Sequence, residues 1–170
     1  MKEFDVEDHI EYFHAIAGKH KNIKGFYIMD INELETSIRS DLQYPALVLV
    51  SVTGGIDAGN EDNILNRPKS GFIIIDHVAQ VDDFDGEVVA MASTWKIAQQ
   101  ILARIKKDSE CNGDIAEIDL SSVKYEMMGP VFDNDWGWLF SFDTICSIND
   151  LKIDPDAWLE QPKAGMSGHK

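Results

Sequence analysis

Cysteine is scarce in this chain of 170 residues, which contains only Cys111 and Cys146. The two positions form neither a CxxC pair nor the larger set of cysteines from which a disulfide framework is built. Cys146 falls within an apolar segment, where an unpaired thiol behaves as a small core residue. The sequence therefore predicts a protein of a reducing compartment rather than a disulfide-stapled scaffold.

Long apolar runs are also missing. The longest, at 46–50 and 72–75, have the length of single strands and fall far short of a bilayer. The first residues, M-K-E-F-D-V-E-D-H-I, are acidic and lack the apolar region of a signal peptide. We therefore expect no membrane partner and no secretion by a signal peptide.

Basic residues are few, since 15 lysines and arginines stand against 30 acids, for a formal net charge of −15. Phosphate backbones and anionic lipids attract basic faces, so this balance disfavours sequence-specific nucleic acid binding and membrane-surface binding. An acidic surface keeps a protein soluble or steers it toward a basic partner. The bases that are present gather in two groups, Lys19, Lys21 and Lys24, and Arg104, Lys106 and Lys107.

The richest apolar segment is D-N-D-W-G-W-L-F-S-F-D-T-I-C-S-I at 133–148, which alternates with a period of two. Such alternation predicts a strand with one heavily apolar face. That face carries Trp136, Trp138, Phe140, Phe142, Thr144, Cys146 and Ile148. We expect its middle, Phe140, Phe142 and Cys146, to pack under Trp95 and Leu102.

Trp95 and Leu102 belong to the strongest helical pattern in the sequence. Apolar positions recur at steps of three and four and predict a long helix over about 87–108. Shorter patterns predict a helix from Val6 that Gly18 closes, and a second helix over 33–41. Strands are expected at 26–29, 46–52, 71–78, 115–120 and 123–132, with an exposed loop at 56–70.

This element order predicts one α+β domain over 1–148. Its sheet is mostly antiparallel or mixed and is packed by the long helix, with an N-terminal helix and a C-terminal β-hairpin. Residues 149–170 form an extension that packs on the domain or on a neighbour. Within it, Asp154 is expected to cap a helical turn that begins at Pro155 and turns Trp158 and Leu159 inward.

No motif assigns catalysis, a metal or a cofactor. The five histidines show no HxH or HExxH spacing, and no serine lies in a GxSxG elbow. The acidic loop 81–86 fails as a calcium loop, because Val81 and Ala92 would fall at ligand positions. We expect this loop to cap the following helix.

Some side chains instead indicate protein contacts. Exposed tryptophan and methionine commonly anchor interfaces. For Trp136 the core and interface interpretations are balanced, whereas Trp138 is favoured as core. The interface candidates are Trp136, Met127, Met128, Asp82, Asp83, Asp85, Arg67 and Trp158.

The element order resembles that of bacteriophage tail terminator and related neck, or head–tail joining, proteins. The resemblance is architectural. It is carried by the helix I-E-Y-F-H-A-I-A, the strands Y-P-A-L-V-L-V-S and G-F-I-I-I-D-H-V, the helix A-S-T-W-K-I-A-Q-Q-I-L-A-R-I and the strand D-W-G-W-L-F-S-F.

The resemblance implies a non-enzymatic subunit of a phage tail or contractile injection particle that forms rings, usually hexameric, with other tail or neck proteins as partners. It would lie in the host cytoplasm during assembly and then in the virion, and loops 56–70 and 81–86 would contact neighbours. Two alternatives stay open from the residues themselves. One is an acidic antagonist or immunity-type protein that binds a basic partner. The other is an enzyme whose acidic catalytic residues the sequence does not identify.

Overall fold

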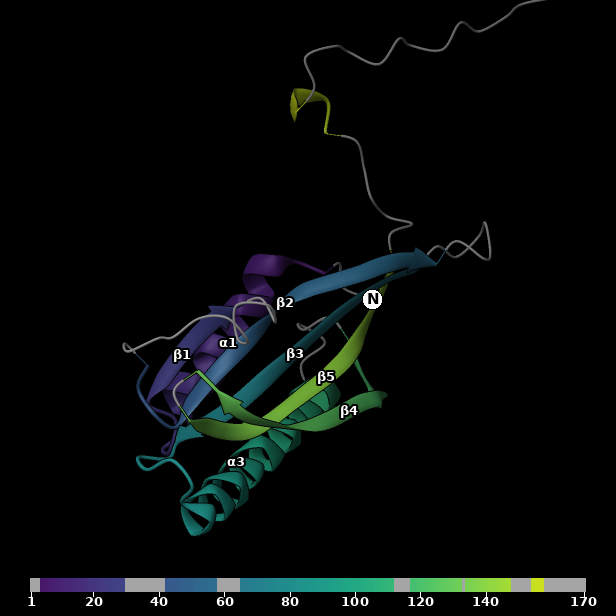
Figure 1. Cartoon of the computed structure of the whole chain (residues 1–170). Helices are drawn as coiled ribbons and strands as arrows, with labels where there is room; N and C mark the ends of the chain where they lie inside the picture. Colours follow the sequence, from purple (N-terminus) through teal and green to yellow (C-terminus); the bar gives the residue numbers. More distant parts are fainter. Residues whose placement is uncertain are drawn as a thin grey trace, which may run out of the picture.

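A five-stranded mixed sheet forms the centre of the molecule, and helices cover one of its faces (Figure 1). The computed structural model describes residues 4–29, 42–57, 65–111, 117–132, 134–147 and 154–157. In chain order the elements are α1 (Val6–Lys19), β1 (Gly25–Met29), β2 (Ala46–Asp57), β3 (Leu65–His77), α3 (Phe84–Cys111), β4 (Glu117–Val131), β5 (Asp135–Ser147) and the 3-10 helix η1 (Pro155–Ala157). The predicted α+β class is confirmed.

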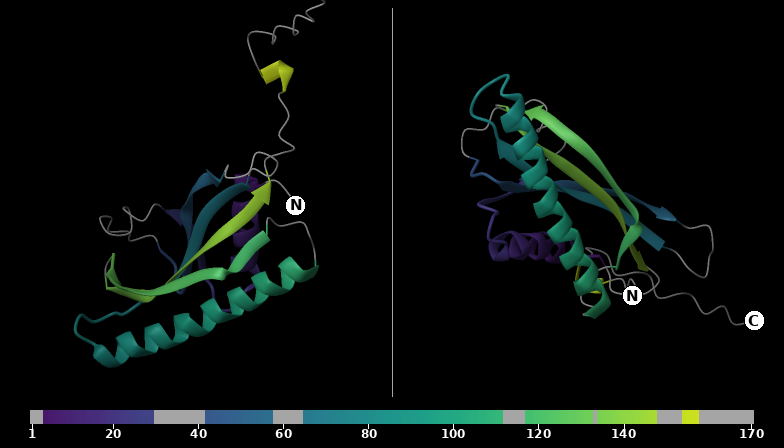
Figure 2. Two further views of the ribbon diagram at one scale, coloured as in Figure 1. Left: turned by 90° about the vertical axis from the view of Figure 1, so that its right-hand side faces the viewer. Right: turned by 90° about the horizontal axis from the view of Figure 1, so that it is seen from below.

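The strand order is β1-β2-β3-β5-β4, so β1 and β4 are the two edge strands. β1 runs parallel to β2, and all other neighbours are antiparallel. On the covered face, α1 packs against β1 and β2, whereas α3 packs against β3, β5 and β4 (Figure 2). None of the described helices combines the length and apolar character that crossing a membrane requires.

The main core lies between the helices and the sheet. Phe72 and Phe140, which face each other on β3 and β5, stack with ring centroids 5.4 Å apart. Phe140 also packs on Trp95, as the alternating pattern predicts. By contrast, Phe142 stacks on Phe13 of α1, and Cys146 places its sulfur 3.4 Å from the carbonyl oxygen of Asn66. The aromatic strand therefore joins both helices to one core.

The second face of the sheet has a core of its own. Val48, Ile73 and Ile75 are fully buried there and pack with Met29 and Val50. This explains why β2 and β3 are apolar on consecutive residues, since both of their faces are covered.

The prediction of an exposed loop at 56–70 is wrong at both of its ends. β2 continues through Gly54 and Gly55 to Asp57, and β3 begins at Leu65, so residues 56–57 and 65–70 are paired strand. The part at 58–64 lies outside the described residues. A Cβ atom at Gly54 would lie 2.8 Å from the carbonyl oxygen of Arg67. The glycine therefore permits close approach of the two strands instead of ending one.

The predicted strands 115–120 and 123–132 are one strand, β4. Its pairing with β5 shifts register between Asp119 and Lys124 and again between Met128 and Val131. Gly129 and Pro130 lie within β4 at the sheet edge, where a proline costs no ladder hydrogen bond. The hairpin between β4 and β5 is confirmed.

Helix ends differ slightly from expectation. α3 begins at Phe84 and ends at Cys111, longer than the 87–108 that the spacing predicts. α1 continues past Gly18 to Lys19, and Val6 is 53% exposed instead of joining the core. The helix expected at 33–41 lies outside the described residues, as do Trp158 and Leu159. Asp154 caps η1, accepting a hydrogen bond from the amide of Asp156 at 3.0 Å.

The sequence did not predict that His9 would be buried. Its ring lies against Phe4 and Phe13, and Nε2 is 2.8 Å from the hydroxyl of Ser70. Burial disfavours the charged imidazolium and lowers the pKa of His9 to about 4, against 6.5 for the unperturbed ring.

Stability should therefore fall in mild acid. Between pH 6.5 and about 4 the unfolded chain binds a proton at His9 that the folded chain does not. From about pH 7 to pH 5, this group should remove roughly 2 kcal/mol from the free energy of unfolding. Denaturant unfolding at both pH values should show a smaller pH-dependent loss for His9→Gln. The same loss in both proteins would contradict this role of His9.

Candidate interaction surface

Most of the interface candidates meet at one end of the molecule, where β3 ends, α3 begins and β4 turns into β5. Asn134 holds these segments together, since its side-chain amide donates to the carbonyl oxygens of Val78 at 2.8 Å and Gln80 at 3.1 Å. The backbone carbonyl oxygen of Asn134 accepts a hydrogen bond from the backbone N–H of Val78 at 3.1 Å. The residues gathered here are Asp82, Asp83, Asp85, Met127, Met128 and Trp136.

A row of large apolar side chains runs along this end of α3. Phe84, Val88, Met91 and Trp95 recur at helical spacing and span about 17 Å. Phe84 is 71% exposed and Val88 59%, whereas Met91 and Trp95 are half-buried. On the edge strand β4, Tyr125 and Met127 face the same layer and are also exposed. We call these six residues the apolar strip.

The inner end of the apolar strip is firmly anchored. Trp95 packs edge-on against Trp138 and Tyr125, with ring centroids 4.8 Å and 5.1 Å apart. The indole N–H of Trp138 donates to the carbonyl oxygen of Met91 at 2.9 Å. The strip is thus continuous with the core at Trp95, and it is presented to solvent at Phe84 on a preformed helix.

The tryptophan and methionine candidates divide between surface and core. Met127 is 52% exposed within the apolar strip, but Met128 packs against the core of the opposite sheet face. Trp136 is half-buried: its ring covers Gly129, and its indole N–H donates to the side-chain oxygen of Asn134 at 3.1 Å. A Cβ atom at Gly129 would lie 2.4 Å from this ring. Trp136 therefore packs the β4–β5 turn.

The acidic candidates flank the outer end of the strip. Asp83 caps α3, since its carboxylate accepts from the amide of Gly86 at 3.0 Å, as expected of this loop. Asp82 and Asp85 are exposed on either side of Phe84. Arg67 lies at the other end of β3, where its Nε is 3.6 Å from a carboxylate oxygen of Asp57. Trp158 is outside the described residues.

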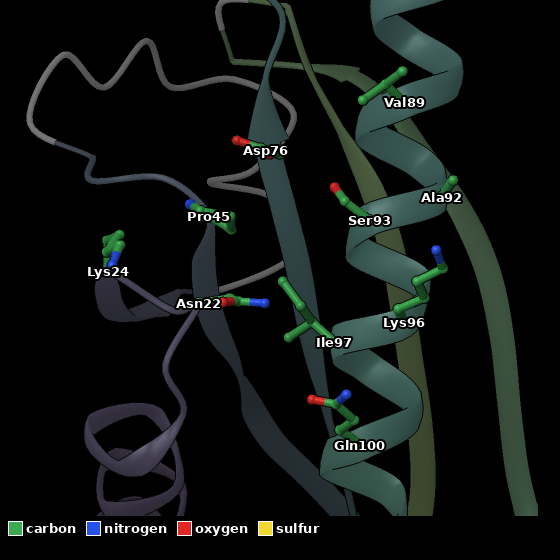
Figure 3. Close-up of a pocket in the computed structure, with 10 residues that line it drawn as sticks. All are labelled: Asn22, Lys24, Pro45, Asp76, Val89, Ala92, Ser93, Lys96, Ile97 and Gln100. Carbon is green, nitrogen blue, oxygen red and sulfur yellow. The ribbon is translucent and has the colours of Figure 1, made fainter.

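A groove opens on the helix-covered face, between α3 and the turn that joins α1 to β1 (Figure 3). Its volume is about 590 Å³. Lys24 and Lys96 stand at its two margins, and Asp76 is the one carboxyl group among its described lining residues. Burial raises the pKa of Asp76, although a hydrogen bond from the backbone N–H of His77 opposes this.

A polar cluster lies across the sheet from Asp76. The Asp135 side chain is fully buried and accepts hydrogen bonds from the Tyr44 hydroxyl and from Nδ1 of His77, the latter at 2.8 Å. His77 is about one third exposed, and its Nε2 has no partner among the described residues. A carboxylate that orients an imidazole is one element of a general base. Asp135 itself has no exposed surface with which to touch a substrate.

The described residues contain no group of three histidine, cysteine, aspartate or glutamate side chains that could hold a metal ion. In the sequence, Asp135 is one of many acidic residues near a turn, and nothing distinguishes it from the others. Tyr44, its partner, is 91 positions away in the chain, so no local pattern could have paired them.

No protein-family model matches this chain, and no curated protein has a significantly similar sequence.

Proposed function

We propose that this protein is a non-enzymatic structural subunit that forms a ring, of the tail terminator or connector type, in a phage tail or contractile injection particle. The observation that carries the proposal is the apolar strip. Its exposed members would remain in water in an isolated subunit, even though the chain carries a net charge of −15. Preformed surfaces with exposed aromatic and methionine side chains typically bind other proteins.

The placement of the strip also supports assembly. Trp95 and Trp138 fix its inner end, and Phe84 and Val88 lie on the same preformed helix, so a partner that covers them need not order the backbone. The segments that resemble those of tail terminators form one open sheet with α1 and α3 packed on one of its faces. Homo-oligomers of such subunits bury apolar surface that each copy alone exposes.

Size-exclusion chromatography with light scattering tests this proposal. The wild-type chain should elute at a discrete multiple of the 19.1 kDa monomer mass, and Phe84→Ser should shift it toward the monomer. Ile56→Ser is the matched control. Ile56 is 66% exposed on the far end of β2, so this variant should keep the oligomer. If the oligomer persists in Phe84→Ser, the apolar strip does not form the contact between subunits.

A second candidate is an acidic antagonist that binds one basic protein, favoured by the net charge and by the exposed Asp82 and Asp85 beside the strip. A monomer that forms a salt-sensitive one-to-one complex with a basic protein would support it. A homo-oligomer that persists at high salt would argue against it.

A further inference from the structure

We infer that neighbouring subunits contact each other through two different surfaces. The exposed start of α3 from one copy, with Phe84 and Val88, occupies the groove between α3 and the α1–β1 turn of the next copy. This inference rests on the proposed function and identifies the contact that would build the ring.

The groove has the shape and lining that such an insertion needs. Its volume of about 590 Å³ lies within the range of pockets that bury small organic groups. Val89, Ala92 and Pro45 supply apolar surface, and Ile97 forms the deep part of the lining at 3% exposed. Asn22 and Ile97 point toward one another from opposite sides (Figure 3).

Charge complementarity identifies the occupant as a second copy of the chain. Lys24 and Lys96 stand at the groove margins, and Lys19 and Lys21 extend the basic surface along the α1–β1 turn. Asp82, Asp85 and Glu87 surround Phe84 and Val88 at the start of α3.

None of these lysines or acids forms an ion pair within the part of the chain that the structure describes. Opposite charges on two separate surfaces of one chain steer copies together and fix their orientation.

The placement of the two surfaces favours repetition. The groove lies on the flank of α3 that faces α1, whereas the apolar strip lies on the flank next to β4. A contact between unlike surfaces leaves one of each available on every pair, so further copies add until the rotation closes a ring.

Pairing through the edge strand β4 is less suited to this role. Two register shifts and the Gly129–Pro130 pair interrupt its exposed edge, and such features discourage addition of another strand.

Charge reversal on each surface tests the inference. One variant carries Asp85→Lys with Glu87→Lys, a second carries Lys24→Glu with Lys96→Glu, and a third carries all four changes. Sedimentation velocity at low ionic strength should show an oligomer for the wild type and monomers for each two-site variant alone. The four-site variant should regain the oligomer, because the opposite charges meet again with their signs exchanged.

Mixing the two-site variants gives a sharper result. Each retains one unaltered surface, but the unaltered groove and the unaltered helix start lie on different proteins. The unaltered helix start of one variant meets the unaltered groove of the other, and the two charge-reversed surfaces are complementary in the same way. The mixture should therefore form oligomers in which the two variants alternate, although neither variant forms one alone. Lys107→Glu with Glu11→Lys, both at exposed positions away from these surfaces, is the matched control and should leave the oligomer intact.

The failures of the two proposals can be told apart. If the wild type forms rings that survive both two-site variants, the inferred contact is wrong while the ring subunit stands. If the four-site variant stays monomeric although circular dichroism shows it folded, the contact is also wrong. If the wild type is a monomer at every concentration, both proposals are overturned.

Discussion

The replacement of Gly137 by alanine should prevent folding or lower the free energy of unfolding by at least about 3 kcal/mol. Gly137 faces Ile75 where β5 pairs with β3. A Cβ atom there would lie 1.8 Å from the carbonyl oxygen of Ile74, on a central strand that cannot shift without disturbing both cores. Urea unfolding followed by tryptophan fluorescence would measure the loss.

Gly55→Ala is the control for this prediction. No atom lies within 4 Å of a Cβ built at Gly55, which is exposed on the extended part of β2. Its substitution should change the free energy of unfolding by less than about 1 kcal/mol. Equal effects at the two glycines would mean that β5 does not approach β3 as closely as described.

The second large effect is expected at Asp135. Asp135→Asn should lower the free energy of unfolding by about 2–3 kcal/mol, because an amide cannot accept both hydrogen bonds and brings a donor into a buried site. Asp143→Asn, on the same strand and half-buried, should cost less than about 1 kcal/mol. Thermal and urea unfolding of both variants would measure the difference.

A double-mutant cycle with Tyr44→Phe separates the pair from its surroundings. Because Tyr44 donates to Asp135, the two substitutions should cost less together than the sum of their separate costs. Unchanged stability of Asp135→Asn combined with loss of a measurable turnover would assign the Tyr44–Asp135–His77 cluster to catalysis. That outcome would contradict a purely structural protein.

Local patterns predicted the elements whose partners lie on one continuous face. The steps of three and four between Val88 and Ile105 located α3, and the alternation from Trp136 to Cys146 located β5. Both signals arise because one side of the element is buried. The alternation of a strand also explains why His77 and Asp76 lie on opposite faces of the sheet, since adjacent strand residues point to opposite sides.

Long-range pairing explains the errors. The stretch at 56–70 is polar and rich in loop-forming residues, yet residues 56–57 and 65–70 belong to β2 and β3 through backbone pairing that their side chains do not reveal. His9 is buried because α1 lies over Ser70, 61 positions away.

The candidate surface could be predicted only in part. Met127 and the acids Asp82 and Asp85 were identified from residue type and turn position, and the structure places them together. Val88 was expected in the buried stripe of the long helix and Phe84 in the loop before it, because periodicity does not reveal that α3 begins at Phe84 or that its first turns are exposed. The groove at Lys24 and Lys96 joins segments 72 positions apart in the chain, and no sequence pattern marks it.

Electron microscopy of the purified full-length chain tests ring formation most directly. Class averages should show closed rings with a single rotational symmetry, and they should become rare in the Phe84→Ser variant. A field of single subunits across a concentration series, with no ring in any class, would contradict the account.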